Sequence, residues 1–207
     1  MLQYGTIEPR TLEVLRILMA MPELDTFYLV GGTALSLYYG HRLSVDLDLF
    51  STTDFHTEIL LPVMERTFPD FNYSRPTPIG IFGFIGNIKV DFIRYHYHSM
   101  MGTPYLENGI RLMSIEDIMA MKVAAILKRA VKKDFWDIAE LLDHYTMDEL
   151  INCYNQKYPN QQLLISIPQA LTYFSDAEDS EEPVSLKRQT WTDVKKRINK
   201  KVDVYLK

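Results

Sequence analysis

The fold is decided by the segment FYLVGGTALSLYYG at residues 27–40 and by RLSVDLDLF, which follows it at residues 42–50. The first four residues form an apolar run that is typical of a buried strand, and they lead directly into Gly31 and Gly32. The residues after the glycines have the apolar spacing of a short helix. Val45–Phe50 alternates apolar and acidic side chains, which is the period of a half-buried strand. The sequence therefore predicts a strand, a glycine turn, a short helix and a second strand.

Two carboxylates are expected on one face of that second strand. Asp46 and Asp48 are two residues apart, so both side chains leave the same side of a strand. Carboxylates held this close repel each other unless a cation lies between them, and hard oxygen ligands suit Mg²⁺ or Mn²⁺. The predicted strand Ile88–Ile93 carries a third acid, Asp91. If the two strands are neighbours, three carboxylates converge, which is the ligand set that two-metal phosphoryl transfer needs.

The glycine turn supplies a phosphate-binding element beside these acids. Gly31 and Gly32 allow backbone amides to approach a phosphate closely, and the helix that follows presents its positive N-terminus. The Thr33 hydroxyl is expected either to cap this helix or to donate a hydrogen bond to a phosphate.

The rest of the chain divides into two parts of different composition. Further helices are expected at residues 11–21, 55–68, 114–129, 134–145, from 146 onward, 168–174 and 190–205, and further strands at residues 71–74, 79–85 and 88–95. An acidic stretch at residues 176–182 is expected to be an exposed linker. We place the boundary near Pro104, which gives an α/β domain at residues 1–104 and a helical domain at residues 105–207.

Composition and charge limit the classes of function. Of the 207 residues, 47% are hydrophobic and 24% charged, which indicates a globular protein that buries its own core. The single cysteine excludes an intramolecular disulfide, and neither a signal peptide nor a membrane-spanning run is evident, so a cytoplasmic protein without a membrane partner is expected. The net charge of −5 argues weakly against nucleic acid, whereas basic runs at residues 128–133 and 187–207 keep a phosphate-bearing partner possible.

The two opening segments also resemble a known family. Residues 29–35 and 42–50, together with Lys122, Arg129 and KDFWDI at residues 133–138, are similar in order and spacing to the signature of the AbiEii toxins of type IV toxin–antitoxin systems. These belong to the polymerase-β-like nucleotidyltransferase superfamily. The resemblance implies a nucleotidyltransferase domain of α/β (α+β) class with a mixed sheet, followed by a mainly helical C-terminal half.

The resemblance also implies three sets of site residues. They are a catalytic set of Asp46, Asp48, Lys122 and Asp134, a nucleotide-binding set of Gly31, Gly32, Thr33, Arg42 and Lys122, and a metal-binding set of Asp46, Asp48 and Asp91. Asp134 is expected to activate the acceptor or to organise the site, and Lys122 to meet the triphosphate.

Some roles stay open at this point. Lys122 is otherwise an exposed helix lysine, and Asp137 is either part of the site or a solvated helix acid. Arg42 pairs with a carboxylate or with a phosphate. Lys133 stands where the family commonly has arginine, which keeps the charge and loses the bidentate fork.

The implied function is metal-dependent transfer of a nucleoside monophosphate from an NTP to an acceptor hydroxyl, with release of pyrophosphate. The resemblance suggests the 3′ end of a tRNA as acceptor and the role of a toxin paired with an antitoxin protein. Two alternatives remain: transfer to a small molecule of the aminoglycoside type, and a catalytically silent domain that binds a partner through the same scaffold.

Overall fold

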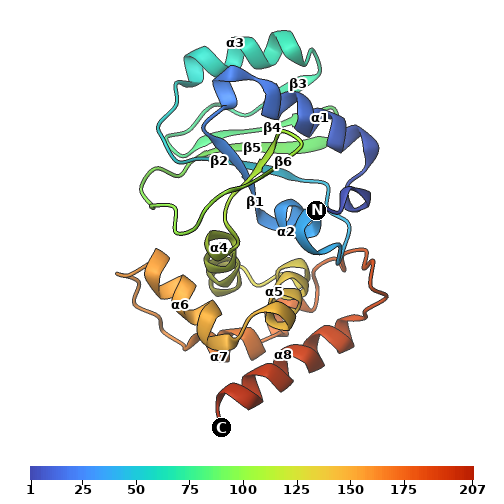
Figure 1. The fold of residues 1–207 in the computed structure, drawn as a ribbon, viewed down its shortest axis with the longest axis vertical. Helices are drawn as coiled ribbons and strands as arrows, with labels where there is room; N and C mark the ends of the chain where they lie inside the picture. The colour runs from blue at the N-terminus through green and yellow to red at the C-terminus, as the bar shows by residue number, and fades with distance from the viewer.

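One mixed seven-stranded sheet forms the centre of the protein, whose computed structural model describes residues 1–207 (Figure 1). The strands, in the spatial order β3-β4-β5-β2-β1-β7-β6, are β1 (Phe27–Val30), β2 (Leu47–Ser51), β3 (Phe71–Tyr73), β4 (Gly80–Ile85), β5 (Ile88–Arg94), β6 (Tyr105–Glu107) and β7 (Ile110–Leu112). The helices are α1 (Pro9–Ala20), α2 (Gly31–Tyr39), α3 (Thr57–Thr67), α4 (Ile115–Lys128), α5 (Lys132–His144), α6 (Met147–Lys157), α7 (Ile167–Thr172) and α8 (Trp191–Tyr205).

The helices cover the sheet unequally. Helices α1 and α3 lie on one face of the sheet, whereas α2 lies on the other face with α4 and α5 beyond it (Figure 1). Helices α6, α7 and α8 form the layer farthest from the sheet. This arrangement confirms the predicted class, a mixed sheet followed by a mainly helical C-terminal half. None of the helices combines the length and hydrophobicity that crossing a bilayer requires.

Strand β2 lies in the middle of the sheet and carries the predicted acids. It pairs antiparallel with β1 and parallel with β5. Its alternation is as expected, since Leu47 and Leu49 are fully buried while Asp48 is half-buried on the opposite face. The predicted start at Val45 is wrong, because Val45 is exposed and the strand begins at Leu47. Asp46 therefore precedes the strand.

The sheet extends beyond the boundary expected near Pro104. Strands β6 and β7, of three residues each, were not predicted from the sequence. The signal for them was Asn108-Gly109, whose φ angles of 50° and 79° form a tight hairpin turn. Strand β7 pairs in parallel with β1, and one hydrophobic core of 51 buried side chains spans the sheet and the helical half. The division into two domains stays a prediction, and we move its boundary to the end of β7.

All five acidic residues of the stretch at residues 176–182 are exposed, as expected of a linker. The chain after it returns to the loop between α2 and β2, where Leu43 donates its N–H to the Val184 carbonyl (2.9 Å) and Leu186 donates to the His41 carbonyl (3.0 Å). The bridge between Arg42 and Ser185 lies between these two bonds. The loop that carries Arg42 is thus held by a segment far away in sequence.

A buried ion pair fixes α6 against α4. The Lys157 ammonium contacts the Asp117 carboxylate, and both side chains are buried. Asp117 also accepts hydrogen bonds from the Met101 N–H (2.9 Å) and the Ser114 hydroxyl (2.5 Å). Because a buried charge is expensive without a partner, Lys157 and Asp117 hold the two helices and the loop before β6 in one arrangement.

We predict that Lys157→Met lowers the free energy of unfolding by about 3–5 kcal/mol, although methionine has a similar volume, because the Asp117 carboxylate loses its buried counter-charge. Urea unfolding of the variant and the wild type measures this. Lys195→Met is the control, since the Lys195–Glu178 pair is partly exposed and is expected to contribute no more than about 1 kcal/mol. Equal effects of the two substitutions would contradict the prediction.

Candidate active site

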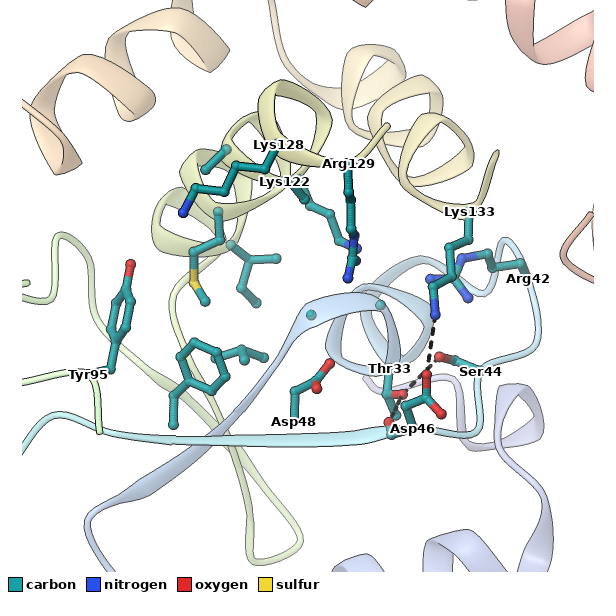
Figure 2. Close-up of a pocket in the computed structure, with 18 of the residues that line it drawn as sticks. Thr33, Arg42, Ser44, Asp46, Asp48, Tyr95, Lys122, Lys128, Arg129 and Lys133 are labelled. Carbon is teal, nitrogen blue, oxygen red and sulfur yellow. Dashed lines mark hydrogen bonds and ion pairs between the residues drawn. The ribbon is translucent and has the colours of Figure 1, made fainter. Parts of the chain in front are cut away.

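A pocket of about 340 Å³ opens between the sheet, the start of α2 and helices α4 and α5 (Figure 2). Its two ends differ in chemistry. In Figure 2 Tyr95 lies at one end, whereas Arg42, Asp46 and Lys133 lie at the other, with Asp48 between them. The charged lining residues are Arg42, Asp46, Asp48, Lys122, Lys128, Arg129 and Lys133, and the larger apolar and aromatic ones are Val30, Phe50, Tyr95, Ile118, Met121 and Tyr158.

The two glycines are required by close contacts at the start of α2. Gly31 has φ +71°, a left-handed conformation, and a Cβ there would lie 2.5 Å from Oδ2 of Asp48. A Cβ on Gly32 would collide with the Arg42 guanidinium. Helix α2 begins at Gly31, two residues earlier than predicted, and no side chain caps its N-terminus. Because the first N–H groups of a helix have no partner within it, this end of α2 is suited to bind an anion.

Thr33 does not cap the helix, and its hydroxyl is already engaged in hydrogen bonds within the protein. Its side chain is buried, and its hydroxyl hydrogen-bonds with the Ser44 hydroxyl (2.8 Å) and donates to the Asp46 backbone carbonyl. Thr33 therefore fixes the backbone just before β2 and, through it, the direction of the Asp46 carboxylate (Figure 2). A direct contact between the Thr33 side chain and a phosphate stays a prediction.

Asp46 and Asp48 both line the pocket, as the sequence predicted. Burial raises the pKa of Asp48 above its usual value. Asp46 is partly exposed and lies 3.3 Å from Nζ of Lys133. Mg²⁺ in proteins is commonly held by one or two carboxylates together with substrate phosphates and water. The pair of carboxylates beside the open end of α2 fits this donor set.

Asp91 is close to Asp48 in the sheet but separate in its contacts. The two residues are directly opposite in the parallel β2–β5 register. Asp91 does not line the pocket, and its Oδ2 lies 2.5 Å from Nζ of Lys89. The chain contains no group of three acidic, histidine or cysteine side chains with the spacing of metal ligands. The structure thus brings Asp46 and Asp48 to the pocket without Asp91, and a metal-binding role of Asp91 stays a prediction.

The Asp137 carboxylate is the centre of a buried network. It accepts hydrogen bonds from Nε (2.7 Å) and Nη2 (3.0 Å) of Arg42, and it lies 2.6 Å from Nζ of Lys122 and 2.7 Å from Nε2 of His41. Burial alone would raise the pKa of Asp137, but the charges of Arg42 and Lys122 outweigh it and hold this pKa well below the usual range. The alternative of a solvated helix acid is therefore wrong for Asp137.

Asp134 extends the network to the rim of the pocket. Its buried carboxylate lies 3.0 Å from Nζ of Lys122 and 3.0 Å from Nε of Arg129, whose side chain is 56% exposed. Burial opposes ionisation of Asp134, but Lys122 and Arg129 lower its pKa below the usual value. Of the two roles considered for Asp134, these contacts favour organising the site over taking a proton.

The outcome for the basic residues is mixed. Lys122 is buried and lines the pocket, so it is not an exposed helix lysine. Arg42 pairs with the Asp137 carboxylate, and a contact of Arg42 with a nucleotide phosphate stays a prediction. Lys133 was noted only as a departure from the family and in fact lies against Asp46.

The aromatic end of the pocket, with Tyr95 and Tyr158, was missed. These two hydroxyls are 2.8 Å apart although the residues are 63 positions apart in sequence, so no local pattern announces the contact.

We predict that Gly31→Ala destabilises the protein more than Gly109→Ala. Both glycines have a positive φ, +71° and +79°, so both substitutions bear a similar backbone strain of about 1 kcal/mol. Only the Cβ at residue 31 meets another group, the Asp48 carboxylate, whereas nothing lies within 4 Å at residue 109. The extra cost of overpacking is about 1–3 kcal/mol, measured by urea unfolding of both variants. Equal stabilities of the two variants would show that a Cβ at residue 31 does not clash with the Asp48 carboxylate.

We also predict that Asp137→Asn costs about 3–5 kcal/mol of unfolding free energy, because Arg42 and Lys122 then stay buried without their counter-charge. Asp143→Asn on the same helix is the control, since Asp143 pairs with Arg197 at the surface and its loss costs at most about 1 kcal/mol.

The difference in unfolding free energy between wild type and Asp137→Asn should also depend on pH. The pKa of Asp137 is lowered by folding, so its contribution is present above the ordinary aspartate pKa and is lost as the pH falls through the folded value. The stability gap between wild type and Asp137→Asn should therefore narrow below about pH 4. A gap that is constant down to pH 2.5 would contradict this.

Sequence comparison relates this chain to a family of nucleotidyltransferases. The profile of the family described as nucleotidyl transferase AbiEii toxin, type IV TA system, matches residues 13–204. An uncharacterized protein of Aquifex aeolicus (strain VF5) is 32% identical over 94% of this chain and 95% of its own length.

Two solved structures share the fold. JHP933 from Helicobacter pylori has a TM-score of 0.60 and 18% identity, with 96% of this chain and 92% of that chain covered. MenT4, a nucleotidyltransferase toxin from Mycobacterium tuberculosis, has a TM-score of 0.55 and 13% identity, with 93% and 81% covered. At these identities the likeness concerns the fold alone. The family match spans nearly the whole chain and confirms the resemblance seen in the sequence, so this protein belongs to the AbiEii family of nucleotidyltransferase toxins from type IV toxin–antitoxin systems.

Proposed function

We propose that the protein transfers a nucleoside monophosphate from an NTP to an acceptor hydroxyl, in a metal-dependent reaction within the pocket of Figure 2. The observation that carries this proposal is the meeting of two carboxylates, Asp46 and Asp48, with an uncapped helix N-terminus in one pocket that also contains buried and exposed cations.

The triphosphate fits the charged end of the pocket. Residues 31–33 at the start of α2 line it, and Lys122 and Arg129 reach it from the opposite wall (Figure 2). Lys122 is held by two buried carboxylates, so its ammonium is already in position before a substrate arrives. Fixed positive charges of this kind stabilise negative charge that develops during phosphoryl transfer. We therefore assign Lys122 and Arg129 to the phosphates and Arg42 to positioning of the glycine turn.

The divalent ion fits the side of the pocket formed by Asp46 and Asp48. A bound Mg²⁺ or Mn²⁺ would lower the pKa of the acceptor hydroxyl and neutralise charge on the phosphates. The Lys133 ammonium lies 3.3 Å from Asp46, and an ion bound by this carboxylate would displace it.

The reaction balances as a single displacement. The acceptor oxygen forms a bond to the α-phosphorus while the bond from that phosphorus to the bridging oxygen breaks. Pyrophosphate leaves, and the hydroxyl proton is lost to water. The nucleobase then occupies the apolar end of the pocket, where the Phe50 and Tyr95 rings lie 5.1 Å apart between centroids.

Membership of the family supports the biological part of the proposal. A type IV toxin implies an antitoxin partner, and the resemblance in the sequence pointed to a tRNA 3′ end as the acceptor. The exposed cations at the pocket rim, Lys128, Arg129 and Lys133, are suited to a phosphate-bearing acceptor.

The test is transfer of label from each of the four α-labelled NTPs to total tRNA, with Mg²⁺ or Mn²⁺. We expect wild type to label RNA, and Asp46→Ala or Asp48→Asn to reduce the rate more than about 100-fold, because each substitution removes a ligand charge from the transition state. Asp203→Ala, an exposed acid on α8, is the control and should keep the wild-type rate. No labelling with any NTP would overturn the tRNA proposal and favour a small-molecule acceptor or a silent binding domain.

A further inference from the structure

The sheet has an uncovered face beside the site. On β4, Ile81 and Ile85 point into the core, and Phe82 and Phe84 point to the opposite face. Phe84 is 48% exposed. A hollow of about 390 Å³ over this face is lined only by residues of β3, β4 and β5 and by Ser74 just after β3. No helix packs on the two rings.

This face continues directly from the proposed active site. Phe82 is opposite Asp91 in the β4–β5 register, and Asp91 is opposite Asp48 in the β5–β2 register. A second row runs from Asn72 through Phe84 to Lys89. Since neighbouring strands are about 4.8 Å apart, Phe82 lies on the order of 10 Å from Asp48 across the sheet.

The polar groups on this face suit nucleotides. Lys89 offers a partly exposed ammonium, and Asn72 and Ser74 are exposed beside the rings. The face thus has two aromatic rings for bases, amide and hydroxyl groups for base edges, and one cation, Lys89, for a phosphate.

The approach of the acceptor is limited by the pocket. With a triphosphate at the start of α2 and the base at the aromatic end, helices α4 and α5 close the side opposite the sheet. One approach to the α-phosphorus then runs along the sheet, past Asp91, from the uncovered face. The rings lie on this path.

We propose that the uncovered face of β3–β4–β5 binds the single-stranded end of a nucleic-acid acceptor, with terminal bases stacked on Phe82 and Phe84. This rests on the proposed function, because it names the subsite from which that reaction takes its hydroxyl. Bases stack on exposed aromatic side chains in a sequence-tolerant way, and each such contact contributes substantially to affinity. The Lys89 ammonium lies 2.5 Å from the Asp91 carboxylate, so the cation of this face is next to the acid that separates the face from the pocket.

The test compares two substitutions of one ring. Phe84→Leu keeps an apolar side chain and removes the π face, whereas Phe84→Tyr keeps the π face. The probe is a fluorescently labelled single-stranded RNA with a free 3′ hydroxyl, titrated by anisotropy at fixed low salt. We expect Phe84→Leu to weaken binding roughly tenfold and Phe84→Tyr to bind like wild type. In the transfer assay the KM for RNA should rise by a similar factor for Phe84→Leu, with the KM for NTP unchanged.

Tyr173→Leu is the matched control, because Tyr173 is a 51% exposed aromatic residue at the end of α7, remote from the sheet. It should leave RNA binding unchanged. The platform is overturned if wild type does not bind the RNA, if Phe84→Leu binds as tightly as wild type, or if Phe84→Leu and Tyr173→Leu weaken binding equally. If Phe84→Tyr also fails to bind, stacking is excluded as the cause.

The two proposals fail in different ways. Binding that depends on the Phe84 ring, without transfer of label from any NTP, would support the platform and overturn the proposed reaction on RNA. Transfer of label that depends on Asp46 but not on the Phe84 ring would support the reaction and overturn the platform.

Discussion

The structure depends on one buried carboxylate, that of Asp137, which joins the helical half to the loop between α2 and β2. It binds Arg42 from that loop and Lys122 from α4. Removing buried charges from water is costly, so such groups are stable only when they are paired together. The orientation of Arg42 in turn requires Gly32, because a side chain there would displace the guanidinium. One ion cluster therefore sets the start of α2 and the position of the lysine that faces it across the pocket.

The same cluster decides which charges are available to a substrate. Asp134 and Asp137 are both paired with cations, and their pKa values are lowered, so both carboxylates stay ionised. Asp46 and Asp48 remain as the acids of the pocket. The partner of Asp46 is Lys133, in an ion pair exposed on both sides. Exposed pairs are weak, so a divalent ion can displace this ammonium at little cost. The buried ion pairs of Asp137 fix the positions of Arg42 and Lys122, whereas the exposed pair of Asp46 and Lys133 can be replaced by a bound ion.

Local patterns made the core of the site predictable, and long-range contacts did not. The strand, the two glycines and the alternation around Asp48 are all encoded within residues 27–50, and the structure confirms each of these elements. Arg42 and Asp137 are 95 positions apart, so the sequence could not decide between a carboxylate and a phosphate as the partner of Arg42. Strands β6 and β7 were missed, and β7 joins the sheet by pairing with β1, a contact between segments far apart in sequence. Asp91 lies outside the pocket and contacts Lys89, and both facts depend on side-chain directions that only the folded strand reveals.

Strand β4 carries apolar side chains on both faces, a pattern typical of strands that are covered on both sides. In this chain it is one strand from the edge of the sheet, and only one of its faces is covered. Gly83 shows that the covered face is tightly packed, since a Cβ there would meet the Asn72 carbonyl and the Phe71 ring. The exposed Phe84 ring has no such structural role, because its removal would open no cavity in the core. The Phe84 ring lies on the face that continues through Phe82 and Asp91 to Asp48, and this position accords with the proposed contact with an acceptor.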